Sequence, residues 1–599
     1  MGVKTRSAFG WAGLTVLVAG VVLLFPSYDR FVEATRGVSE DLRPLLMGAL
    51  VLGIAAAGTV IVRAFIPEED GDGAEPWGVR AVFAARAAAF GLGALLVWWT
   101  LPTRHMALTV FNDGYRMYPE PLFGLWGGVC VIALGLFLSV FGEWRLRTRP
   151  WPVAAAGVLA GAVGATLVWA GTPSARHALT SEHTVAPAGE GAPIPAEVTR
   201  IGWTWEPELP VVGVDAGPRG PIVRHADGFT ALDGSSGEEL WTYRLHYGRK
   251  VETGVFPGTP ERAHLLHRED PTAETRTLVV LDTATGEVVH DAPMPEPDEE
   301  ETRRAHLGVD VRVRLVHEDG ASTVVAHPVD STEPLWEHTV EDVVPGRWCH
   351  REPDDGMRVY GDRVLIARHC MDEEDLVEED GSPYPPQEVP EGAVRSVTAL
   401  DAATGEQVWR HEGVLRGRYD GHPPVIGGEP AREAADPVVT DLGAVFDLET
   451  GEPLPLLPDL PGEPLESGDR LWAVDTAGAV VLRDPGEEEP SPVLRTDATG
   501  EVVRTFEGDR TLLRHQLMSP LPLAETVVAP VLFHDDLPED ARAVALLPWG
   551  GTPAGDDVRW IDLGRYSDTD REDHRVLAGP GSVVSYVRDT ALPLHGLVP

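Results

Sequence analysis

Lysine and asparagine are almost missing from this chain of 599 residues. Lysine occurs only at Lys4 and Lys250 and asparagine only at Asn112, so arginine carries the positive charge. Such usage is typical of a GC-rich bacterial genome. After residue 112 no asparagine amide is available as a ligand, which bears on any calcium or cofactor site there.

Cysteine is scarce as well, with only Cys130, Cys349 and Cys370. Three cysteines exclude a disulfide-rich scaffold and a zinc-finger pattern. Cys349 and Cys370 flank a short strand predicted at 363–367, and we predict a disulfide between them in an oxidising exterior. Free thiols and a zinc site with the adjacent histidines are the alternatives. The zinc site is disfavoured because adjacent residues on a strand point to opposite faces.

Positive charge is in short supply, with 49 Lys and Arg against 93 Asp and Glu. Residues 1–171 hold 13 basic and 12 acidic residues, which leaves 36 basic and 81 acidic residues for the remainder. A part this acidic repels nucleic acid, so we exclude nucleic acid as a partner. It stays soluble by self-repulsion and attracts cations or basic partners.

Recognisable catalytic motifs are missing too. The sequence contains no H-E-x-x-H, no Gly-x-Ser-x-Gly elbow, no P-loop, no dinucleotide fingerprint and no EF-hand loop. Acidic runs occur at 296–301, 372–375 with 378–380, and 535–540. We interpret them as solvated loops, with weak calcium binding as the alternative. We predict no catalytic residue, no cofactor-binding residue and no metal ligand.

What the chain does have is a set of five apolar segments before residue 172, at 8–25, 45–66, 79–101, 122–141 and 152–171. Each is close to the roughly 20 residues that cross a hydrocarbon core, and in lipid such segments must be helices. We therefore predict a five-helix transmembrane domain at 1–171 in the lipid bilayer. Gly157 and Gly161 form a GxxxG pair, which either packs two helices closely or is incidental in an Ala/Gly-rich span.

Arginines set the expected orientation of these segments. Arg145, Arg147 and Arg149 crowd one short loop, which should be cytoplasmic by the positive-inside rule. With five crossings the N-terminus is cytoplasmic and residue 172 onward is extracellular. The first segment is read as a retained helix because Phe25-Pro-Ser-Tyr lacks a cleavage pattern. The expected location is the cell membrane, as a multi-pass protein.

A repeated unit appears beyond a Pro/Gly/Ala-rich stretch at 172–200, which reads as a flexible linker. The clearest copies are Ala231-Leu-Asp-Gly-Ser-Ser-Gly-Glu-Glu-Leu-Trp241, Val280-Leu-Asp-Thr-Ala-Thr-Gly-Glu-Val-Val-His290 and Ala399-Leu-Asp-Ala-Ala-Thr-Gly-Glu-Gln-Val-Trp409. In each copy an apolar strand ends at Asp, and a turn containing Gly precedes the next strand. The predicted turn residues are Asp233, Gly237, Asp282, Gly286, Asp401, Gly405, Asp447 and Gly451.

The spacing of these turns predicts the fold of residues 201–599. Asp233 and Asp282 are 49 residues apart, and Asp401 and Asp447 are 46 apart. About 48 residues is one four-stranded blade, so we predict an all-β propeller with seven or eight blades. The first and last strands should share one closing blade, which leaves no open sheet edge.

The Leu-Asp-x-x-Thr-Gly-Glu-x-x-Trp repeat resembles the pyrroloquinoline-quinone (PQQ) repeat of quinoprotein-type propellers. Five helices followed by an external propeller also look like the membrane-bound quinoprotein glucose dehydrogenases. That resemblance implies PQQ with Ca²⁺, held by a carboxylate, an asparagine amide and carbonyl groups. The asparagine ligand has no counterpart here, and the vicinal Cys-Cys pair of many soluble relatives is missing. No cofactor is therefore our expectation.

Three hypotheses for the function follow from these features. The first hypothesis is a membrane-tethered, non-enzymatic platform outside the cell that binds a protein or envelope ligand on one propeller face. The second is a PQQ-dependent oxidoreductase that passes electrons to membrane quinone. The third is an assembly scaffold with partners inside the membrane. The propeller repeat is shared by all three classes, so the fold alone does not decide between them.

Overall fold

The computed structural model forms two compact units. One contains residues 1–182 with 244–251 and 267–274, and the other contains the remaining residues. The structure describes residues 3–34, 91, 94–95, 97–103, 119–141, 151–246, 251–268, 275–295, 306–318, 321–340, 348–349, 357–371, 394–414, 425–427, 438–441, 444–455, 470–483, 491–508, 520–531, 541–550, 558–565 and 573–599.

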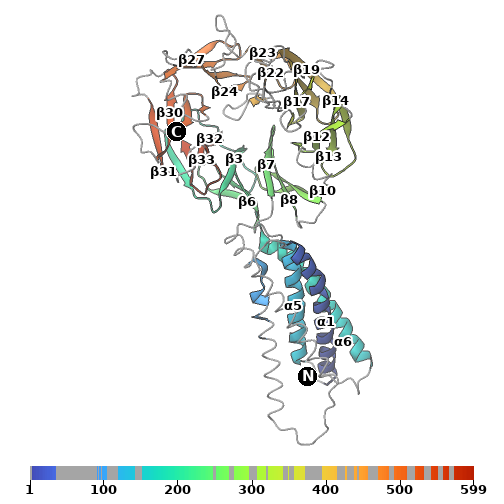
Figure 1. Ribbon diagram of the computed structural model, residues 1–599. Coiled ribbons are helices and arrows are strands. Elements are labelled where there is room, and N and C mark those ends of the chain that lie inside the picture. Colours follow the sequence, from blue (N-terminus) through green and yellow to red (C-terminus); the bar gives the residue numbers. More distant parts are fainter. Residues whose placement is uncertain are drawn as a thin grey trace, which may run out of the picture. The chain divides into compact units, whose positions relative to one another are not determined.

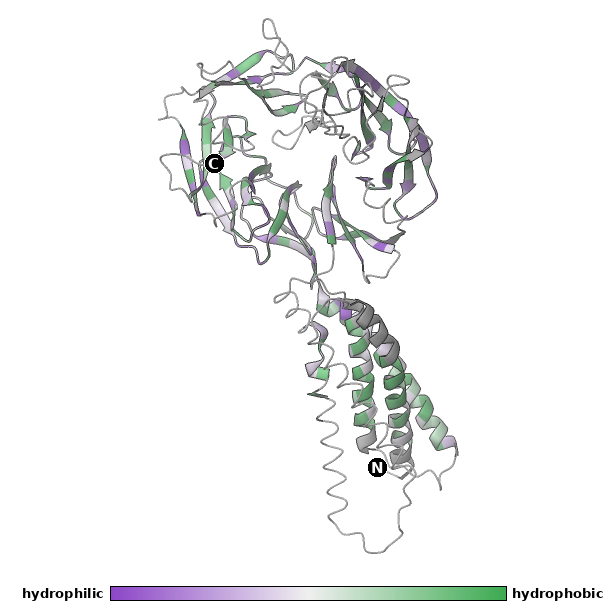
Figure 2. Cartoon of the chain, in the orientation of Figure 1, coloured by the Kyte–Doolittle hydropathy of each residue, from purple (hydrophilic) through white to green (hydrophobic). Residues whose placement is uncertain are grey.

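Three helices with described bounds pack together in the first unit: α1 (Val3–Ala34), α5 (Pro119–Phe141) and α6 (Trp151–Thr180) (Figure 1). Their described residues are largely apolar (Figure 2). A Cβ atom on Gly157 would lie 2.6 Å from the Ala8 carbonyl oxygen, and one on Gly161 would lie 2.6 Å from that of Ala12. The GxxxG pair is therefore a close helix contact and not an incidental one.

The prediction of five membrane-spanning helices is wrong. Among the described residues one helix, α6, is long and apolar enough to cross a membrane. In α1 and α5 the apolar stretches with described side chains are Ala8–Leu24 and Leu122–Leu138. The predicted span at 45–66 lies outside the described residues, as does most of 79–101.

The second unit is a ring of antiparallel sheets (Figure 1). Blade 1 contains β3 (Val211–Gly217), β4 (Gly220–His225), β5 (Gly228–Leu232) and β6 (Glu239–Leu245), and blade 2 contains β7 (Val251–Phe256), β8 (Thr259–His267), β9 (Thr275–Asp282) and β10 (Val288–Pro295). Blade 3 contains β11 (His306–Leu307), β12 (Val311–Glu318), β13 (Ala321–Pro328) and β14 (Trp336–Val340), and blade 4 contains β16 (Met357–Tyr360), β17 (Arg363–Met371), β18 (Val394–Asp401) and β19 (Gln407–Val414). Two short strands extend these sheets: β1 (Ser181–Thr184) beside β6, and β15 (Trp348–Cys349) beside β17.

The other four blades follow the same order. Blade 5 contains β20 (Val425–Gly427), β21 (Val438–Asp441), β22 (Ala444–Asp447) and β23 (Pro453–Leu454), and blade 6 contains β24 (Arg470–Asp475), β25 (Gly478–Leu482), β26 (Ser491–Thr496) and β27 (Val502–Gly508). Blade 7 contains β28 (Leu521–Pro522), β29 (Thr526–Pro530), β30 (Ala541–Pro548) and β31 (Arg559–Arg565). Blade 8 contains β32 (His574–Gly579), β33 (Ser582–Val587) and β34 (Leu594–Val598) with β2 (Arg200–Trp205). The described strands thus form eight sheets, and the predicted propeller of seven or eight blades is confirmed.

Contacts between neighbouring sheets close the ring. The inner strand β32 contacts both β3 and β28, and β24 contacts both β20 and β28. The cores lie between blades: Val480 and Phe506 of blade 6 pack with Val527 and Ala545 of blade 7. The closing blade was also predicted, since β2 from the start of the propeller pairs with β34 at its end.

Blade 3 departs from the repeat. Its inner strand β11 has two residues, and its turn at Asp330 lacks the glycine of the other copies. The inner hairpins of blades 2 and 4 meet beside it, where the Gly361 amide donates to the Pro257 carbonyl at 2.8 Å. This contact joins blades 2 and 4 directly, next to the weakest copy of the repeat.

Candidate binding surface on the turn face

The turn face is the end of the propeller where the third strand of a blade turns into the fourth. At Asp282 the carboxylate Oδ1 accepts from the amides of Ala284 and Thr285 at 3.0 and 3.1 Å, and from the Thr285 hydroxyl at 3.2 Å. The Gly286 amide donates to the Asp282 carbonyl at 2.7 Å, and the Asp282 amide donates to the Glu287 carbonyl at 2.9 Å. One side chain therefore fixes the whole turn.

All eight predicted turn residues lie at this position in blades 1, 2, 4 and 5. Oδ1 of Asp233, Asp401 and Asp447 accepts the same three hydrogen bonds. The four glycines have φ between 70° and 75°, which a residue with a Cβ atom adopts only with strain. Asp497 in blade 6 forms a shorter version of the turn with Thr499 and Gly500.

A tryptophan from the preceding blade packs on each of these turns. Trp241 of blade 1 donates from Nε1 to the Thr283 carbonyl at 2.9 Å, and a Cβ on Gly286 would lie 2.6 Å from the indole. The same arrangement joins Trp203 to Gly237, Trp336 to Gly405 and Trp409 to Gly451. The turn and the contact between blades therefore depend on the same glycine.

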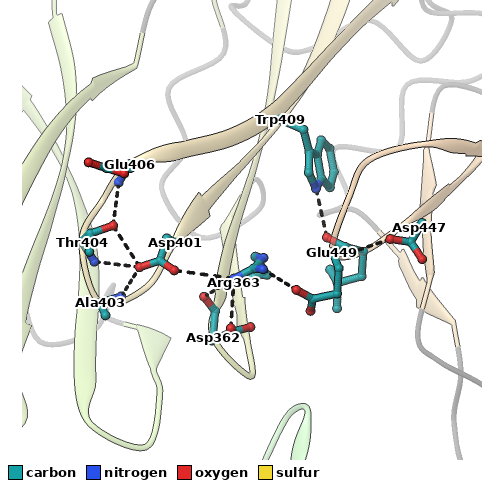
Figure 3. Close-up of polar contacts among 10 residues, drawn as sticks. Asp362, Arg363, Asp401, Ala403, Thr404, Glu406, Trp409, Asp447 and Glu449 are labelled. Atoms are coloured by element: carbon teal, nitrogen blue, oxygen red, sulfur yellow. Dashed lines mark hydrogen bonds and ion pairs between the residues drawn. The ribbon is translucent and has the colours of Figure 1, made fainter.

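Blades 4 and 5 are also joined through one arginine (Figure 3). The Arg363 guanidinium, 11% exposed, lies 3.0 Å from the Asp362 carboxylate and 3.7 Å from that of Asp401, and it pairs with Glu449 of blade 5. Burial favours a higher pKa for Asp401, but hydrogen bonds from its own turn and the charge of Arg363 outweigh it and lower that pKa. Burial and two carboxylates, Asp362 and Asp447, raise the pKa of Glu449 against the effect of Arg363.

Exposed glutamates remain on the turn face after these contacts are made. The Glu that ends each turn is exposed in blades 1, 2, 4, 5 and 6, at Glu238, Glu287, Glu406, Glu452 and Glu501. The turn aspartates use their oxygens within the protein, whereas these glutamates extend from rigid turns at the spacing of the blades. The surface thus carries a row of exposed carboxylates, one from each of these turns.

Residues 185–199, which we call the strap, run along the turn face over blades 1, 2, 7 and 8. The strap accepts hydrogen bonds at the carbonyls of Pro187, Pro193 and Ala196, from the Arg219 side chain and from the amides of Gly581 and Glu525. At its start the Ala186 amide donates to the Thr285 carbonyl, and at its end the Thr199 amide donates to that of Val598. The strap therefore contacts blades 2, 1, 8 and 7.

The strap falls within the stretch predicted as a linker at 172–200. The first residues of that stretch belong to α6 and β1. Within the strap, Val198 is buried, with 2% of its surface exposed. Glycine at 191 is required, because a Cβ there would lie 2.2 Å from the Pro218 carbonyl oxygen. A stretch rich in Pro, Gly and Ala is consistent with either a linker or a segment that follows a surface closely.

The two cysteines of the propeller meet in blade 4. Cys370 of β17 is fully buried and disulfide-bonded, and Cys349 of β15 stands directly opposite it in the strand register. Cys130, in α5, is a free thiol. The described residues contain no group of three or more metal-binding side chains.

Neither the tryptophan contacts nor Arg363 was recognised from sequence. The tryptophan at the eighth position after Asp in two repeats was visible, but its partner lies in the next blade, so only the fold reveals the contact. Arg262 and Arg363 both lie in the second strand of a blade and pair with the turn aspartate of that blade. That repetition was the available signal for the arginines.

No protein-family model matches this chain, and no curated protein sequence matches it. Among solved structures it is similar to BamB from Moraxella catarrhalis, at 15% identity and a TM-score of 0.33, over 67% of this chain and all of that one. It is also similar to a quinohemoprotein alcohol dehydrogenase from Pseudomonas putida, at 12% identity and a TM-score of 0.23, over 66% of this chain and 67% of that one. These likenesses bear on neither activity nor partner.

Proposed function

We propose that this chain is a membrane-tethered binding platform outside the cell, with the turn face of its propeller as the surface that takes a protein partner. The partner is a segment rich in lysine and arginine. The row of exposed glutamates on rigid turns is the observation that carries this proposal. Complementary charge of this kind steers association and sets register.

Tethering is supported by α6. Most of its apolar window is unburied, and the side chains of Leu159, Val163 and Leu167 are 68%, 50% and 68% exposed. An apolar helix face of this length is stable in lipid. The sequence before α6 carries Arg145, Arg147 and Arg149, which favours a cytoplasmic start of the helix and an outside location for the propeller.

The partner is expected on blades 4 to 6. The strap contacts blades 1, 2, 7 and 8, whereas Glu406, Glu452 and Glu501 extend from consecutive turns in the other part of the ring. Each turn that carries them is held by hydrogen bonds to an aspartate carboxylate, so little backbone conformational entropy is lost when a partner binds. Binding at this surface requires neither PQQ nor Ca²⁺, and we propose that the propeller works without either.

The test uses two variants of equal charge. Glu406→Gln, Glu452→Gln and Glu501→Gln together neutralise the three turns, and the full-length chain is crosslinked in intact cells beside the native protein. We expect one specific adduct with the native chain, and its loss in the triple variant.

The matched control is Glu206→Gln, Glu208→Gln and Glu337→Gln, which removes the same charge from exposed residues that do not belong to the repeat turns of blades 4 to 6. It should keep the adduct. Equal loss of the adduct in both variants would show that binding depends only on net charge. An adduct retained by the turn variant would place the partner elsewhere.

A further inference from the structure

The ring is closed by a non-covalent seam in blade 8. In the other seven blades the four main strands follow one another in sequence, whereas in blade 8 the outer strand β2 comes from the other end of the propeller. It pairs with β34 through Arg200 opposite Val598 and Thr204 opposite His595. Opening of the ring at this seam requires no break in the chain.

A buried polar cluster lies at this seam. His595 is 7% exposed and its Nδ1 lies 3.0 Å from the Thr204 hydroxyl of β2. His574 is 1% exposed, with Nε2 2.7 Å from the Ser585 hydroxyl of β33. Arg542 of blade 7, also 1% exposed, donates to the Pro593 and Ser585 carbonyls at 2.8 and 3.3 Å. One cluster thus connects β2, β34, β33, β32 and β30.

Among the described residues, the charged side chains that lower the pKa of the two histidines are arginines. Arg542 faces them from β30 and Arg575 acts from β32, while β33 and β2 contribute the hydroxyls of Ser585 and Thr204. Burial, and then the charge of Arg542, lowers the pKa of His595 to about 4 and that of His574 well below its usual value. Both histidines are therefore neutral in the closed ring at neutral pH.

We infer that blade 8 is an acid-sensitive closure, in which protonation of His595 and His574 beside Arg542 releases β2 from β34 and opens the ring. Once β2 leaves, His595 reaches water and takes up a proton that the closed seam excludes. Neutral histidines keep the seam closed at and above neutral pH, and closure weakens as the pH falls from about 6.5 towards about 4. This inference does not depend on the partner proposed above.

Hydrogen exchange of the full-length chain in detergent, corrected for intrinsic rates, tests this directly. The amides of β2 and β34 are compared with those of β18 and β19, in blade 4, at pH 7.5 and pH 5. For the pKa of His595, which moves from about 4 to about 6.5 on opening, protection at the seam should fall about 30-fold. The blade 4 amides should lose far less.

Two substitutions separate local opening from general acid unfolding. His595→Gln removes the titrating group and should abolish most of the loss at the seam. His264→Gln is the control: burial and Arg224 also lower the pKa of His264 to about 4, but it lies in blade 2. The seam should open in that variant as it does in the native chain.

A third variant covers the case in which His595→Gln does not fold. Ile201→Cys with Leu597→Cys places two thiols at directly paired positions of β2 and β34, and their disulfide should keep the seam protected at pH 5. Equal loss of protection in blades 8 and 4, or no loss in either, would overturn the inference. So would rescue of the seam by His264→Gln.

Discussion

At the scale of single residues, the repeat turn was predictable and its neighbour was not. The contacts of Asp282 and Gly286 lie within six residues, so spacing and residue type suffice to place them. Trp241 meets its acceptor, the Thr283 carbonyl, 42 residues further along the chain. A contact between blades follows from the closed ring and not from local sequence.

The glycine of the turn is expected to be irreplaceable for two separable reasons. Gly286→Ala combines a positive φ of 75° with a Cβ 2.6 Å from Trp241, so we expect a loss of about 2–4 kcal/mol in the free energy of unfolding. Chemical denaturation of the full-length chain in detergent, followed by tryptophan fluorescence, measures this loss.

Two other glycines act as controls. Gly550 has a φ of 82° with open space around its Cβ position, so Gly550→Ala should cost about 1 kcal/mol from backbone strain alone. Gly579 lacks both constraints, and Gly579→Ala should stay within about 0.5 kcal/mol of the native chain. Equal effects at Gly286 and Gly550 would show that the packing of Trp241 contributes nothing.

At the scale of elements, strands were predicted better than helices. A strand in this fold is marked by an apolar run that ends at the Asp turn, and β5, β9, β18 and β22 all end at or just before it. The helices had only apolar length as a signal. Length alone did not separate α6, which meets the test for a span among the described residues, from α1 and α5, which pack against it.

The disulfide ties β15 to the sheet of blade 4. Closing the loop between Cys349 and Cys370 restricts the unfolded chain, and loss of the bond should lower the free energy of unfolding by about 3 kcal/mol. We expect Cys349→Ala with Cys370→Ala, and the native chain in strong reductant, to show the same lowered denaturation midpoint.

The double variant is also the control for the reductant. Because Cys130 is a free thiol, reductant should leave the stability of the double variant unchanged. A native chain whose denaturation midpoint does not respond to reductant would contradict a structural role for the bond.

At the scale of the whole molecule, the ring could be predicted from the repeat spacing, but the proposed binding surface on the turn face could not. Copies 46 to 50 residues apart predict blades, and terminal strands predict a shared closing blade. The positions of Glu406, Glu452 and Glu501 relative to the strap depend on how the chain from 185 to 199 follows the turns. That path rests on close contacts at Gly191 and on the burial of Val198, which composition does not reveal.

The propeller is expected to bind no PQQ and to oxidise no sugar or alcohol when supplied with PQQ and Ca²⁺. Ca²⁺ takes six to eight oxygen ligands, and the propeller offers no asparagine amide. An additional carboxylate in its place would put negative charge beside an anionic cofactor. Reconstitution of the full-length chain followed by dye-linked dehydrogenase assays measures this. Turnover that requires both PQQ and Ca²⁺ would favour the oxidoreductase hypothesis.

Location of the propeller outside the cell, held by α6, is the central claim, and reporter fusions after Arg149 and after Thr180 test it most directly. If α6 crosses the membrane with its arginine-rich start inside, a reporter after Arg149 is active only in the cytoplasm and one after Thr180 only outside. We predict that the two fusions report opposite sides. Both reporters on the same side would contradict the claim.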